Sequence, residues 1–97
     1  MSPLDTFLAR VGDRSAAVGI VGLGYVGLPL ALRFVEAGFR VLGFDIDPRK
    51  VESLNAGRSY IDYIGPERVA RAVRDGRFQA TAEYARAGEA DALLVCV

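Results

Sequence analysis

Three glycines at a fixed spacing are the residues of this chain that most plainly point to chemistry. Gly22, Gly24 and Gly27 form the pattern G-x-G-x-x-G directly after an apolar segment. The first glycine permits a tight turn, the second lets a ligand approach the backbone, and the third lets the next helix pack on the strand. The N–H groups around Tyr25, Val26 and Gly27 would open that helix, where its dipole favours negative charge. The pattern predicts a diphosphate-binding turn; a glycine-rich turn without a ligand is the alternative.

A carboxylate follows the second apolar segment at the distance that a dinucleotide site requires. Asp45 lies about 20 residues beyond the glycines. A carboxylate there accepts hydrogen bonds from both hydroxyls of the adenosine ribose and repels a 2′-phosphate. We therefore expect NAD rather than NADP as the cofactor. Arg49 and Lys50 are close enough in sequence to weaken the repulsion of the 2′-phosphate. A solvated carboxylate at a strand end is the alternative for Asp45.

Other reactive groups are scarce. The chain has no histidine, which excludes Ser–His and Cys–His pairs and the common histidine metal sites within it, so we predict no catalytic residue and no metal ligand. Cys96 stands between two valines without an adjacent base or cation to activate it, and a buried structural thiol is expected. Tyr60 and Tyr63 are predicted to pack a loop onto the sheet or, alternatively, to touch a partner or substrate.

The surrounding pattern alternates strands and helices. Expected strands are 16–21, 41–45, 78–80 and 91–97, and expected helices are 25–37, 48–55, 66–75 and 81–87. The strands are continuous apolar runs, as in parallel sheets covered on both faces. This order predicts an α/β, Rossmann-like, doubly wound parallel sheet with strand order 3-2-1-4, truncated after its fourth strand.

Two parts of the chain are expected. A short helix is expected over residues 1–15, with Ser2 as N-cap and an apolar stripe at helical spacing. Residues 16–97 are expected to form an incomplete dinucleotide-binding domain. The chain stops at Val97 in a buried type of strand, which would leave an unpaired apolar edge. We therefore expect a larger parent protein and self-association through the fourth strand.

Composition narrows the class of protein. The 97 residues make one small domain, and twelve basic residues balance twelve acidic ones, so neither nucleic acid nor an acidic membrane is an expected partner. The sequence contains no apolar run long enough to span a bilayer and no secretory signal pattern. A single cysteine allows no intrachain disulfide and fits a cytoplasmic location.

Longer motifs carry a resemblance to a known family. The runs V-G-L-G-Y-V-G-L-P-L (21–30), G-F-D-I-D-P-R-K-V (43–51) and L-N-A-G (54–57) resemble the start of the nucleotide-sugar 6-dehydrogenases. That family includes the UDP-glucose, GDP-mannose and UDP-N-acetylhexosamine dehydrogenases. The likeness extends from residue 16 to residue 97, and the loop 60–64 is most similar to the UDP-N-acetylglucosamine branch.

The resemblance implies an activity and residue roles. It implies NAD-dependent oxidation of the C6 alcohol of a UDP-sugar to a carboxylate in two steps, by a parent protein that is several times longer and homo-oligomeric. Tyr25 and Val26 would hold the pyrophosphate through their backbone, Asp45 the ribose, and Lys50 would assist Asp45. The family's nucleophilic cysteine lies beyond this segment, so Cys96 does not hold the catalytic position and the fragment alone is expected to be inactive.

Two other interpretations stay open at this point. The same fold could belong to another NAD enzyme such as a hydroxyacid dehydrogenase, because a fold does not fix a reaction. The run from Tyr25 to Pro29 argues against that interpretation. The chain could also be a non-catalytic NAD-binding module that senses redox state or mediates assembly.

Overall fold

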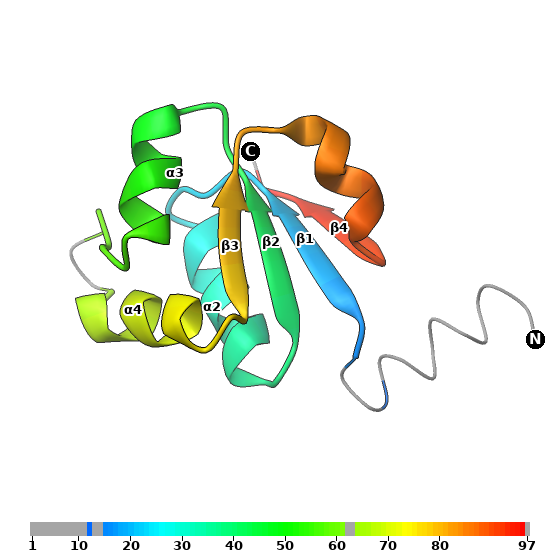
Figure 1. Ribbon diagram of the computed structural model, residues 1–97, viewed down its shortest axis with the longest axis horizontal. Coiled ribbons are helices and arrows are strands. Elements are labelled where there is room, and N and C mark those ends of the chain that lie inside the picture. The colour runs from blue at the N-terminus through cyan, green and yellow to red at the C-terminus, as the bar shows by residue number, and fades with distance from the viewer. Residues whose placement is uncertain (1–11, 13–14, 62–63, 97) are drawn as a thin grey trace, which may run out of the picture.

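The computed structural model describes residues 12, 15–61 and 64–96, and this part of the chain forms a parallel sheet flanked by helices (Figure 1). Its strands are β1 (Ala17–Val21), β2 (Arg40–Phe44), β3 (Phe78–Thr81) and β4 (Ala92–Val95). They pair in parallel in the order β3-β2-β1-β4. This arrangement confirms the predicted fold class and strand order.

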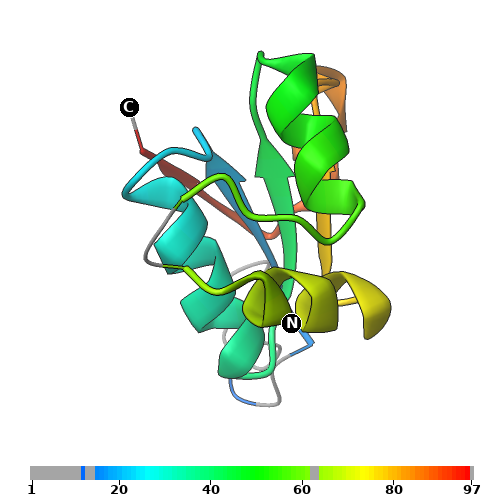
Figure 2. The ribbon, with the colours of Figure 1, turned by 90° about the vertical axis from the view of Figure 1, so that its left-hand side faces the viewer.

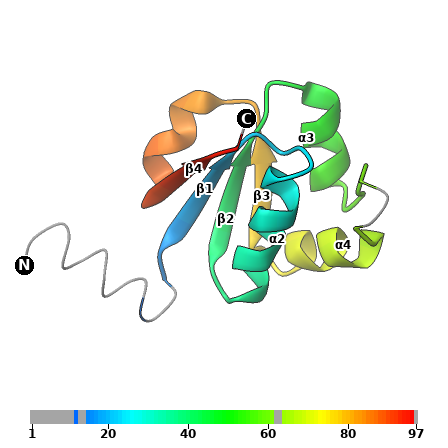
Figure 3. The same cartoon turned by 180° about the vertical axis from the view of Figure 1, so that it is seen from behind.

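The helices are α2 (Gly27–Glu36), α3 (Pro48–Asn55) and α4 (Pro66–Arg74), with a 3₁₀ helix η1 (Tyr84–Glu89) before β4. Figure 3 shows α2 in front of the strands, and Figure 2 shows α4 below α3 and beside the C-terminal end of α2. Helices α2, α3 and α4 pack on one face of the sheet. Phe44 points to the other face, where its ring lies 5.7 Å from that of Tyr84 in η1.

The hydrophobic core lies between the sheet and the helices α2, α3 and α4. Along each strand, residues that face this core alternate with residues that face η1, because successive side chains of a strand point to opposite faces of the sheet. Its fully buried aliphatic side chains each contribute roughly 1.5–3 kcal/mol of transfer free energy. The core residues include Val18, Ile20, Leu23, Leu28, Leu32, Val41, Leu54, Val69, Phe78 and Ala80.

Local sequence signals fix helix α3, which follows the predicted carboxylate. The Asp47 side chain accepts a hydrogen bond of 2.9 Å from the Arg49 N–H, and Pro48 occupies the first helical position. At the other end, the Asn55 side-chain amide donates to the Ala80 carbonyl and accepts from the Ala80 N–H, both at 2.8 Å. The bounds of α3 are therefore those that the sequence predicts, and its end is fastened to β3.

Several predicted bounds are wrong by one or more residues. Helix α2 starts at Gly27 rather than Tyr25, because residues 25 and 26 belong to the turn that leads into it. The predicted helix 81–87 is a 3₁₀ helix that starts only at Tyr84. Thr81 instead ends β3, where it pairs with Phe44, and its hydroxyl accepts a hydrogen bond of 3.0 Å from the Glu83 N–H. The last strand ends at Val95 rather than Val97.

Some predictions lie outside the described residues: most of the N-terminal helix 1–15, Tyr63 and Val97. Among the helices in the described part, none is long and apolar enough to cross a membrane.

Candidate functional site

The glycine turn follows β1 and lies at the end of the sheet where the C-termini of its parallel strands meet (Figure 1). Gly22 has a φ of +95°, a conformation that other residues rarely adopt, and its N–H donates to the Phe44 carbonyl at 2.8 Å. A Cβ at Gly22 would collide with the carbonyl oxygen of Cys96. A Cβ at Gly27 would collide with the carbonyl oxygen of Gly22. The protein itself therefore requires glycine at these two positions.

Gly24 is different, because the folded chain does not require a glycine there. A Cβ built at Gly24 meets nothing within 4 Å, and the residue does not have a positive φ. The side chains of the next two residues, Tyr25 and Val26, are 74% and 68% exposed. The turn is thus open to solvent on the side of Gly24, which leaves room for a ligand to touch its backbone.

Backbone donors gather at this open side. No described residue accepts a hydrogen bond from the N–H of Gly24, Val26 or Gly27, while the Leu28 N–H already returns to the Gly24 carbonyl at 3.1 Å. Val26 is the N-cap of α2 and supplies no side-chain cap. Uncommitted donors at a helix N-terminus bind anions, and here the helix dipole adds its positive end.

Asp45 directly follows β2, and the pairing of Val21 with Phe44 brings it beside the turn. Its side chain is 8% exposed, so it is not the solvated carboxylate of the alternative interpretation. One carboxylate oxygen accepts from the Leu23 N–H at 3.0 Å, and the other accepts from the Asp47 N–H at 2.9 Å. A carboxylate offers about four acceptor sites, so others remain for ribose hydroxyls.

Tyr60 reaches the same turn from a loop that lies far away in the sequence. Its hydroxyl donates to the Leu23 carbonyl, and the Lys50 ammonium lies 5.5 Å from the centroid of its ring. Burial raises the pKa of Tyr60, and the charges of Asp45 and Asp47 raise it further. Sequence reasoning predicted that Tyr60 packs the loop or meets a partner, and it missed this contact. No sequence signal links residues 37 positions apart.

Cys96 adjoins the turn through its backbone. Its N–H donates to the Val21 carbonyl at 2.7 Å, and its side chain is half-buried against the core, where a buried thiol was predicted. Within the described ranges, no three carboxylate, thiol or imidazole groups gather as a metal site would require. The arrangement can bind a diphosphate and a ribose.

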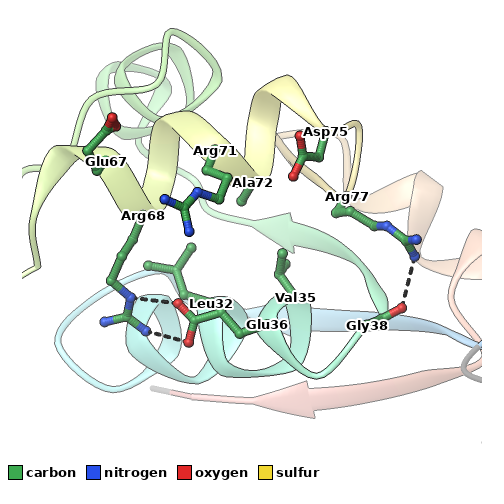
Figure 4. Close-up of a pocket in the computed structure, with 10 residues that line it drawn as sticks. All are labelled: Leu32, Val35, Glu36, Gly38, Glu67, Arg68, Arg71, Ala72, Asp75 and Arg77. Atoms are coloured by element: carbon green, nitrogen blue, oxygen red, sulfur yellow. Dashed lines mark hydrogen bonds and ion pairs between the residues drawn. The ribbon is translucent and has the colours of Figure 1, made fainter.

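A separate cavity of about 550 Å³ lies between α4 and the C-terminal part of α2 (Figure 4). The Arg68 guanidinium spans one end and binds the Glu36 carboxylate through two hydrogen bonds of 2.8 and 3.2 Å. At the other end, Arg77 donates to the Gly38 carbonyl at 2.9 Å. None of the residues predicted to bind the cofactor lines this cavity, so its size does not make it the dinucleotide site.

Comparison with known proteins identifies the family. Residues 16–97 match the model of the UDP-glucose/GDP-mannose dehydrogenase family, NAD binding domain. The UDP-N-acetyl-D-mannosamine dehydrogenase of Pyrococcus horikoshii is 30% identical over 83 residues, which cover 82% of this chain and 19% of that protein. The chain thus spans about a fifth of the length of the curated relative.

Solved structures agree with the sequence match. The NDP-N-acetyl-D-galactosaminuronic acid dehydrogenase of Methanosarcina mazei superimposes with a TM-score of 0.80 at 32% identity, over all of this chain and 22% of that one. A UDP-glucose dehydrogenase from Pyrobaculum islandicum gives a TM-score of 0.79 at 38% identity, over 89% of this chain and 20% of that one. The glycine turn, the adjacent carboxylate and these matches together place the chain in the UDP-glucose/GDP-mannose dehydrogenase family, as its NAD-binding domain.

Proposed function

We propose that the glycine turn and Asp45 form the NAD site of this domain, and that the parent protein oxidises the C6 alcohol of a UDP-sugar to a carboxylate in two steps. The proposed binding residues are Gly22, Gly24, Tyr25, Val26, Gly27, Asp45 and Lys50. When bound, NAD would supply the hydride acceptor for each step, and the residues of this chain would bind and orient it. The residues that act on the sugar are expected outside this chain.

A single observation carries the assignment of the site. The residue between the two first glycines, Leu23, donates its N–H to Asp45, while the next residue, Gly24, is open to a ligand. The turn for the diphosphate and the carboxylate for the ribose are therefore joined by one hydrogen bond. A ligand with a negatively charged bridge next to a ribose, such as NAD, fits both groups.

The geometry supports the proposed roles of the turn and of Asp45, and the role of Lys50 rests on the resemblance. The N–H groups of Gly24, Val26 and Gly27 supply donors for the diphosphate, and the backbone of Tyr25 completes the turn. The free lone pairs of Asp45 accept from the ribose hydroxyls, and its negative charge repels the 2′-phosphate of NADP. Lys50 assists Asp45 from the first turn of α3, where it also covers the Tyr60 ring.

The substrate class rests on similarity alone. Several relatives are named UDP-N-acetyl-D-mannosamine dehydrogenases, which supports a UDP-N-acetylhexosamine. The UDP-N-acetylglucosamine branch stays a prediction from the loop 60–64. A cytoplasmic location and a homo-oligomeric parent protein also belong to this proposal.

Gly24→Val tests the site. Its side chain enters space that the protein leaves empty, so we expect the fold to persist and NAD binding to disappear in calorimetric titration. Gly88→Val is the matched control, since a Cβ at Gly88 also meets nothing within 4 Å and the residue lies in η1. Unchanged NAD affinity of Gly24→Val would refute the site. NADH formation by the full-length protein with a panel of UDP and GDP sugars tests the reaction and its substrate.

A further inference from the structure

The peptide that joins Leu23 to Gly24 is held from several sides. The Leu23 side chain is fully buried and lies so close to Gly43 that a Cβ there would come within 2.8 Å of it. The Leu23 N–H donates to Asp45 at 3.0 Å. The Leu23 carbonyl accepts from the Tyr60 hydroxyl. Leu23 is thus fixed by its side chain, its donor and its acceptor.

The bond to the carbonyl determines the direction of a donor at the site. The Leu23 carbonyl and the Gly24 N–H belong to one planar peptide group, and the chain has no cis peptide among its described residues. In a trans peptide these two groups point in opposite directions. The Tyr60 hydroxyl therefore directs the Gly24 N–H away from the loop of Tyr60, and no described residue accepts a bond from that N–H.

We propose that Tyr60 is a positioning residue of the NAD site, whose hydroxyl sets the Leu23–Gly24 peptide in its binding orientation before the diphosphate arrives. The inference rests on the proposed function of the glycine turn and adds a residue that lies outside the glycine motif. Donors that are already aligned spare a ligand the cost of ordering them, which raises affinity.

The surroundings of Tyr60 suit this role. Lys50 covers one face of the ring. The neighbouring loop is fixed by Ser59, whose hydroxyl bonds both the N–H and the carbonyl of the buried Ile61 at 3.2 Å. Because burial and the nearby carboxylates raise the pKa of Tyr60, its hydroxyl stays protonated and able to donate throughout the neutral range.

Tyr60→Phe removes only the hydroxyl and keeps the ring beneath Lys50. Loss of one hydrogen bond to a partly buried carbonyl is expected to raise the Kd for NAD about fivefold to tenfold. The same loss is expected for ADP, which carries the diphosphate, and a smaller one for adenosine, which does not. Tyr84→Phe is the matched control, because it removes a hydroxyl from the opposite face of the sheet, and its affinities should equal those of the wild type.

Calorimetry of the full chain with NAD and ADP, and NMR titration with adenosine, separate the outcomes. If the wild type binds NAD, and Tyr60→Phe binds both NAD and ADP as tightly as the wild type does, the inference fails while the proposed site stands. An equal loss for ADP and adenosine also overturns it, since the hydroxyl then acts on something other than the diphosphate turn. A wild type that does not bind NAD overturns both proposals.

If Tyr60→Phe does not fold, a measurement on the wild type tests the inference instead. The NMR signal of the Tyr60 hydroxyl proton reports its hydrogen bond to the Leu23 carbonyl, and we expect that proton to be protected from exchange with solvent before NAD is added. A hydroxyl proton that exchanges freely with solvent in the absence of NAD would mean that the turn is not set before the ligand binds, which overturns the inference.

Discussion

Replacing Asp45 by asparagine should damage both the fold and the cofactor site. The two carboxylate oxygens accept from the Leu23 N–H at 3.0 Å and the Asp47 N–H at 2.9 Å. Asparagine has one acceptor oxygen, and its amide group would face the second N–H with donors of its own. Because the side chain is largely buried, water cannot readily take over the orphaned bond.

The expected loss follows from the two bonds. A hydrogen bond to a charged acceptor contributes about 1.5–3 kcal/mol, and a buried donor without a partner costs about 1–3 kcal/mol. Asp45→Asn keeps one weakened bond and loses the other, so we expect the free energy of unfolding to fall by about 2–4 kcal/mol. Against the roughly 5–15 kcal/mol of a typical domain, that loss is large and measurable by urea denaturation.

Ligand binding supplies a second measure of the same change. Without the carboxylate, the ribose loses its charged acceptor, so we expect at least a tenfold weaker affinity for NAD under conditions where the variant stays folded. The preference for NAD over NADP should shrink as well, because the negative charge that repels the 2′-phosphate is gone. Calorimetric titrations with both dinucleotides measure the two effects.

Asp75→Asn provides the control, since Asp75 is exposed at the C-terminal end of α4. Its effect on stability should stay within about 0.5 kcal/mol. An Asp45→Asn protein with the unfolding midpoint and NAD affinity of the wild type would refute the role assigned to the buried carboxylate.

Two further predictions concern high pH and the edge of the sheet. Tyr60 has a folded pKa above its usual 10.0, so the stability that it contributes is complete below pH 10 and is lost as the pH rises past that value. Urea titrations on either side of pH 10 should show a steeper loss for the wild type than for Tyr60→Phe, and equal slopes would contradict the shift. β4 forms an edge of the described sheet with Leu93 48% and Val95 66% exposed, and we expect the chain to self-associate there. Light scattering should show Val95→Lys shifted towards monomer, whereas a wild type that stays monomeric at high concentration would contradict the prediction.

Much of the fold could be predicted because its signals are local. Asp47 and Pro48 start α3 within a few residues of each other, and the glycine motif marks the turn in six residues. The continuous apolar runs indicate strands of a parallel sheet, although Leu93 and Val95 of β4 are exposed. The predicted helix 81–87 was harder, because the helix present, η1, has only six residues. So short a segment has too few residues to separate a 3₁₀ helix from an α-helix by pattern.

The site could be predicted in its parts but not in its connections. The sequence shows Gly24 and Asp45, whereas the bond between the Leu23 N–H and the Asp45 carboxylate depends on the register of β1 and β2. The contact from Tyr60 depends on the path of a loop, and the pattern of residues around it does not specify that path. Tertiary contacts of this kind arise from packing and have no signature in local spacing.

The tight fit between the glycine turn and β4 has a mechanical consequence. The Cys96 carbonyl lies directly against Gly22, and the Cys96 N–H is bonded to Val21. The end of the outer strand and the glycine turn are therefore in direct main-chain contact. We therefore expect a substitution that displaces the end of β4 to displace the glycine turn as well, so that a binding defect could originate in residues that never touch the ligand.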